Sequence, residues 1–140
     1  MYDRAREIDE AIDAGRRALD ALEEAADALD DAKRWGIVDI LGGGVLTSVV
    51  KHARLAEAEK SLSCARAQIM SFSHEMADVR EVAALSADLG SWTAFFDIAL
   101  DNWLTDVFVQ RDISDAADRV DEAIEKVSAA VCRLEAIRGR

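Results

Sequence analysis

Residues 8–29 read IDEAIDAGRRALDALEEAADAL, and their apolar positions recur in alternating steps of three and four residues. The full stripe comprises Ala5, Ile8, Ile12, Gly15, Leu19, Leu22, Ala26 and Leu29. Such a heptad pattern is typical of a helix that buries one narrow stripe against a partner helix. Acidic residues crowd its start and two basic residues close it, which suits the helix dipole. We therefore predict a first helix over residues 2–34, ending at Lys33 and Arg34.

Three further segments downstream also have helical periodicity. A second stripe predicts a helix over residues 45–89 that breaks at Gly90-Ser91; its members are Leu55, Ala58, Leu62, Ala65, Ile69, Phe72, Met76 and Val79. Residues 92–107 place one broad apolar face on a third helix, formed by Trp92, Phe95, Phe96, Ala99, Leu100, Trp103, Leu104 and Val107. A last helix, capped by Asp112 or Ser114, has its stripe at Ile113, Ala117, Val120, Ile124, Val127, Val131 and Leu134.

The composition agrees with this helical pattern. The chain has 140 residues, of which 51% are hydrophobic, with no proline and a formal net charge of −11. It is too apolar for a disordered chain and too acidic to bind nucleic acid through its phosphates, and it lacks an uncharged run long enough for a membrane span. We predict an all-α fold: an antiparallel bundle of about four helices in a single elongated domain over residues 1–140, with two long coiled-coil-like helices joined at a glycine-rich corner.

The unequal helix lengths bear on assembly. The first helix is nearly twice as long as the third, so part of its stripe is expected to lack a partner within the chain. This favours a homodimer in which the long helices pair as a coiled coil, with a monomeric bundle as the alternative. The first residues lack the apolar core of a signal peptide, which predicts a cytoplasmic protein. Cys64 and Cys132 form no disulfide framework and are expected to be reduced and partly buried.

One segment departs from the helical pattern. Residues 35–52 read WGIVDILGGGVLTSVVKH, and between Ile37 and Val50 only Asp39 is charged. Three consecutive glycines, Gly42, Gly43 and Gly44, are costly to order inside an apolar run. They fit a buried corner between two helices, an anion site formed by free amides near Lys51, or a contact with a partner or a membrane surface. A P-loop is excluded because its spacing does not occur.

Polar residues in apolar surroundings mark the candidate site. We expect a polar cluster of Asp39, Lys51 and His52 with one or more of the third-helix aspartates, which are Asp97, Asp101 and Asp106. A salt-bridge network that pins the glycine corner explains these residues better than a metal site does, because the di-iron bundle motif Glu-x-x-His is absent. His74-Glu75-x-x-Asp78 is the other metal candidate, but the helical wheel directs His74 and Asp78 towards solvent. We predict no metal and no cofactor.

The motif Trp-Gly-x-x-Asp-x-x-Gly-Gly-Gly, followed by Lys-His, resembles a family of small helical bacterial proteins with no established function. The segment with Phe96-Asp97, Asp101-Asn102, Asp106, Val109-Gln110 and Ile113 is similar to a downstream part of that family. The resemblance spans roughly residues 35–113 and implies a helical fold, without a reaction, substrate or ligand.

Together these features favour a non-enzymatic helical bundle that acts through self-association and protein contacts. The alternative is a bundle that binds a small molecule, an anion or a metal ion between the glycine-rich corner and the third helix. No recognisable arrangement of nucleophile and base supports an enzyme.

Overall fold

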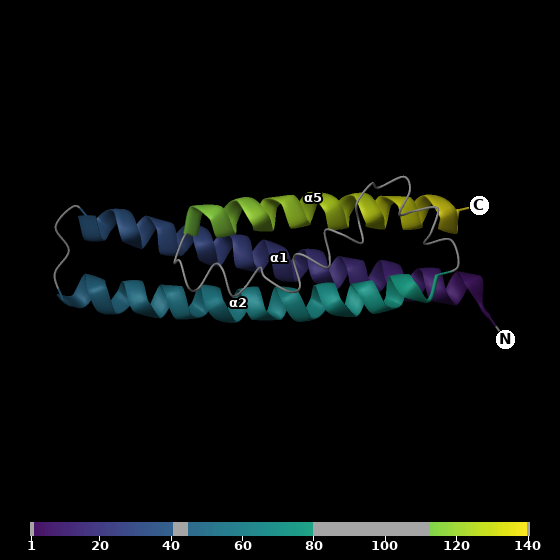
Figure 1. Cartoon of the computed structure of the whole chain (residues 1–140), viewed down its shortest axis with the longest axis horizontal. Coiled ribbons are helices and arrows are strands. Elements are labelled where there is room, and N and C mark those ends of the chain that lie inside the picture. The colour runs from purple at the N-terminus through teal and green to yellow at the C-terminus, as the bar shows by residue number, and fades with distance from the viewer. Residues whose placement is uncertain (1, 41–44, 80–112, 140) are drawn as a thin grey trace.

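The computed structural model describes residues 2–40, 45–79 and 113–139, and these residues form three helices and no strand (Figure 1). They are α1 (Arg4–Ile40), α2 (Val45–Ala77) and α5 (Ile113–Arg138). The all-helical class is thus confirmed for the described residues. The predicted third helix over residues 92–107 and the break at Gly90-Ser91 lie outside them.

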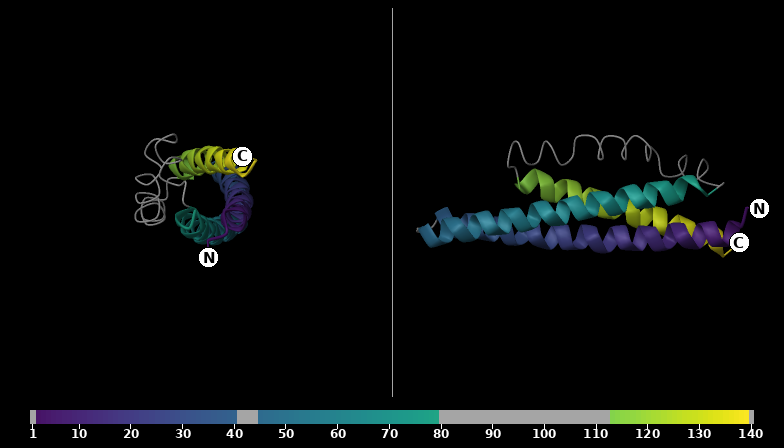
Figure 2. Two further views of the ribbon diagram at one scale, coloured as in Figure 1. Left: turned by 90° about the vertical axis from the view of Figure 1, so that its right-hand side faces the viewer. Right: turned by 90° about the horizontal axis from the view of Figure 1, so that it is seen from below.

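The three helices lie side by side along one long axis. The chain runs along α1, returns beside it in α2, and runs in the same direction as α2 in α5, so both termini lie at one end (Figure 1). The end-on view shows α2 and α5 on two different sides of α1 (Figure 2). α1 packs against both of the other helices, which makes it the central helix of the described fold.

The buried stripe of α1 is wider than the heptad pattern predicts. Ile8, Ile12, Leu22 and Leu29 are buried as expected, whereas Leu19 and Ala26 are only partly buried. The additional buried residues are all alanines, at positions 11, 14, 18, 25 and 32. A helix with one partner buries one stripe, but α1 has two partners, so the small residues beside the stripe are buried as well.

The stripe of α2 matches the prediction at each position whose side chain is described. Its buried residues are Ala58, Leu62, Ala65, Ile69, Phe72, Met76 and Val79. On α5, Val120, Val127, Val131 and Leu134 are buried as predicted, whereas the predicted Ala117 and Ile124 are only partly buried. Ala116, Ala123 and Ala130 are buried in addition. None of the buried side chains in the described residues is polar or charged. The interior is therefore held by the hydrophobic effect and close packing.

Gly15 is the position on α1 where side chains from both partner helices meet. A methyl group added at Gly15 would lie 2.5 Å from Cγ2 of Val131 on α5 and 3.0 Å from the ring of Phe72 on α2. Both distances are shorter than ordinary van der Waals contacts. The glycine therefore provides the space in which the Phe72 ring and Val131 pack over α1.

The helix ends differ from the sequence prediction in several places. Asp3 caps α1, because its carboxylate accepts a hydrogen bond of 3.1 Å from the Arg6 amide. The helix continues to Ile40, six residues beyond the predicted end at Arg34. The basic pair did not stop it, because α2 runs alongside this segment and tertiary packing outweighs weak end signals. Ser114 lies inside α5 and is not its cap, and Asp112 lies outside the described residues.

α2 ends at Ala77, so the predicted end at Leu89 is wrong. The amides of Asp78 and Val79 bond to carbonyl oxygens three residues earlier, at Glu75 and Met76, which closes the last turn. At this point α2 has reached the level of the first turn of α1 (Figure 1). A longer helix would project past the partner that buries its stripe.

Candidate functional site

The residues of the predicted polar cluster are only partly covered by the structure. The backbones of Asp39, Lys51 and His52 are described: Asp39 lies in the last turn of α1, and the other two lie in the second turn of α2. Their side chains lie outside what the structure describes, as do all atoms of Gly42, Gly43, Gly44, Asp97, Asp101 and Asp106. The fold brings the helical segments of Asp39 and Lys51-His52 to one end of the hairpin. The cluster itself stays a prediction.

That end of the hairpin extends beyond α5. We call residues 35–40 of α1 and 45–50 of α2 the hairpin end. Because Val131 faces Gly15, the first residue of α5 is level with about Lys33 when counted back along the helix. α1 therefore continues for about 10 Å past the first described residue of α5 at 1.5 Å per residue. Both side views show the same overhang (Figures 1 and 2).

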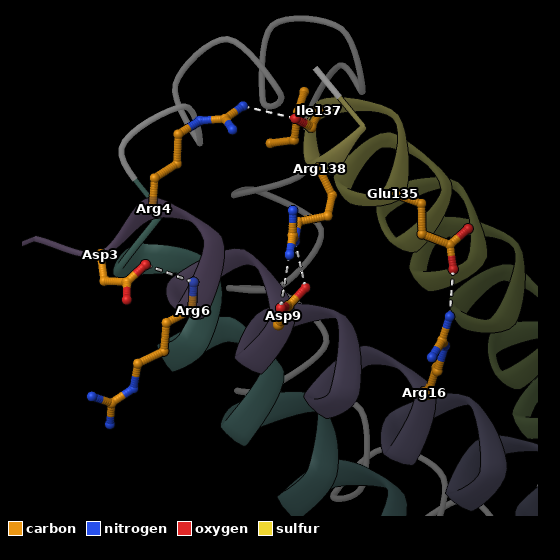
Figure 3. Close-up of polar contacts among 8 residues, drawn as sticks. All are labelled: Asp3, Arg4, Arg6, Asp9, Arg16, Glu135, Ile137 and Arg138. Carbon is orange, nitrogen blue, oxygen red and sulfur yellow. Dashed lines mark hydrogen bonds and ion pairs between the residues drawn. The ribbon is translucent and has the colours of Figure 1, made fainter.

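Arginine side chains join α1 to α5 at the opposite end of the bundle (Figure 3). Nη2 of Arg4 donates to the Ile137 carbonyl oxygen at 2.7 Å, which satisfies an acceptor in the last turn of α5. Nε of Arg138 donates to Asp9 at 2.8 Å. These contacts set the position of the α5 end along α1.

A second ion pair lies further along the same two helices. Nη2 of Arg16 donates to the Glu135 carboxylate at 2.8 Å (Figure 3). Both side chains of this pair are largely exposed, so solvent screens it and it contributes little stability. Its main effect is on how α1 and α5 are aligned along each other.

Three glutamates approach one another where the first turns of α1 meet the end of α2. Oxygen atoms of Glu7, Glu10 and Glu75 lie within 4.8 Å of one another, and all three residues are half-buried. Burial raises the pKa of Glu7 most strongly, and the charges of Glu10 and Asp78 raise it further. Arg6 opposes this effect and pairs with Glu10 at 2.9 Å.

Carboxylate oxygens suit a hard cation such as Ca²⁺, but this group does not make a metal centre by itself. Exposed carboxylates often come this close on acidic helical surfaces, and one of the three is already paired with Arg6. The sequence reading missed the group because Glu7 and Glu75 are far apart in the chain. Aligning the stripes of the first two helices as a hairpin would have found it. His74 and Asp78 are exposed, as the helical wheel predicted.

The two cysteines correct one expectation. Cys64 and Cys132 are free, as predicted, but both are exposed instead of partly buried. Cys64 directly precedes the buried Ala65 and Cys132 directly follows the buried Val131, so successive positions of a helix point in different directions. Neither cysteine lies in the interior that the described helices share.

No family model, curated protein or solved structure matches this chain. The resemblance of residues 35–113 to small helical bacterial proteins therefore stays a prediction. Among the described residues, no helix combines the length and apolar character that crossing a bilayer requires.

Proposed function

We propose that this protein is a non-enzymatic helical bundle that acts through self-association and protein contacts. The observation that carries this proposal is the overhang of the hairpin end, whose sequence is the most apolar part of the hairpin. Among the residues of the hairpin whose side chains are described, none of the buried ones is polar or charged, so their acids and bases lie outside the interior. We propose that this apolar sequence provides a contact surface.

The proposal includes a cytoplasmic location and assembly as a homodimer. Each copy is an acidic, antiparallel bundle of four helices, in which residues 92–107 supply the remaining helix. A coiled coil between the α1 helices of two copies would need an uncovered stripe on α1. Between Ile8 and Ala32 that stripe is not free. Those stripe residues are buried or partly buried within a single chain. The surface for self-association is therefore sought elsewhere on the molecule.

Sedimentation equilibrium over a wide concentration range tests the proposal. We expect a mass that rises from 15.3 kDa at low concentration to twice that value at high concentration. A mass of one chain at every concentration would contradict self-association.

Thermal melting separates this proposal from the ligand-binding alternative. Melts are recorded with EDTA, Mg²⁺, Zn²⁺, inorganic phosphate and ATP, because a ligand that binds the folded chain raises its midpoint. We expect no shift with any of these probes. A shift of several degrees that His52→Ala or Asp101→Ala abolishes would instead favour a binding bundle with a site at the glycine-rich corner.

A further inference from the structure

We draw no further inference here: the strongest candidate, the group of carboxylates of Glu7, Glu10 and Glu75 where the first turns of α1 meet the end of α2, is an acidic cluster alone, and nothing else among the described residues points to a ligand there.

Discussion

Gly15 shows how a single small residue sets the contacts of the whole α1 helix. The Phe72 ring from α2 and the Val131 side chain from α5 both approach the space above it. Valine has one strongly preferred rotamer in a helix, so Val131 cannot rotate away at low cost. The heptad pattern placed Gly15 in the buried stripe correctly but gave no reason for a glycine there. That reason requires the second partner helix.

We predict that Gly15→Ala destabilises the fold. The added methyl group overpacks the site at a cost of about 1–3 kcal/mol, and the better helix propensity of alanine offsets about 1 kcal/mol. Urea denaturation followed by circular dichroism measures the difference. Gly139→Ala is the control, because its added methyl group meets only ordinary contacts at 3.7 Å and beyond. In a Val131→Ala background, Gly15→Ala should destabilise the fold less than it does in the wild type, because the crowding side chain is smaller. A gain of about 1 kcal/mol for Gly15→Ala alone, the full effect of helix propensity, would refute the close contact.

Glu7 provides the second prediction at this scale. Because burial and nearby carboxylates raise its pKa in the folded state, the fold favours the protonated form. The protonated form is populated at low pH, so Glu7 disfavours folding increasingly as the pH rises from its unfolded pKa through its folded pKa. Glu7→Gln should therefore raise the melting midpoint at pH 7, and the gain should disappear below about pH 4, where glutamate is protonated in both states.

The control for Glu7 removes the same charge from an isolated position. Glu59 is exposed on α2 and has no charged residue one helical turn away, so Glu59→Gln reports the general benefit of a smaller net charge. An equal rise in the midpoint for Glu59→Gln and Glu7→Gln would show that the carboxylates around Glu7 have no special effect.

At the scale of the helices, the sequence predicted the stripe of α2 better than those of α1 and α5. The α2 stripe was found without error at the described positions, whereas on α5 the predicted Ala117 and Ile124 are only partly buried. On α1 the heptad pattern ranked Leu19 equal to Leu22, yet Leu22 is fully buried and Leu19 is not. The second stripe of α1 consists of alanines, and alanine is common on both buried and exposed helix faces, so the pattern does not mark it.

Leu19 and Leu22 therefore distinguish the burial found in the structure from the burial that the heptad pattern predicts. Leu22→Ala should destabilise the fold by about 2–5 kcal/mol, as is usual for a fully buried leucine. Leu19→Ala should cost about 1 kcal/mol, because less apolar surface is lost from the interior. The denaturation midpoints of the two variants decide between the structure and the heptad pattern. Equal losses of stability would favour the pattern, in which α1 buries a single stripe.

The ends of helices and the candidate site were harder to predict for a physical reason. The chain has no proline, so helices end where their partners end, and that depends on the register between α1 and α2. The same register brings Glu7 next to Glu75, which no local motif reveals. The sequence did identify residues 35–52 as the segment that departs from the common pattern. The structure adds that this segment lies where the hairpin passes the start of α5.

At the scale of the whole molecule, the length of α1 limits the shape of a dimer. α1 has 37 residues and is about 55 Å long at 1.5 Å per residue. Two copies that meet end to end form a particle with a maximum dimension of roughly 100 Å. Two copies that pair side by side along α1 keep nearly the length of one copy, roughly 60 Å.

Small-angle X-ray scattering at a concentration where sedimentation gives the mass of two chains tests the central claim most directly. We predict a maximum dimension of roughly 100 Å for the dimer, because the stripe of α1 between Ile8 and Ala32 is already covered within one chain and leaves the ends for the contact. A dimer of roughly 60 Å would contradict the claim and place the contact along the sides of the helices.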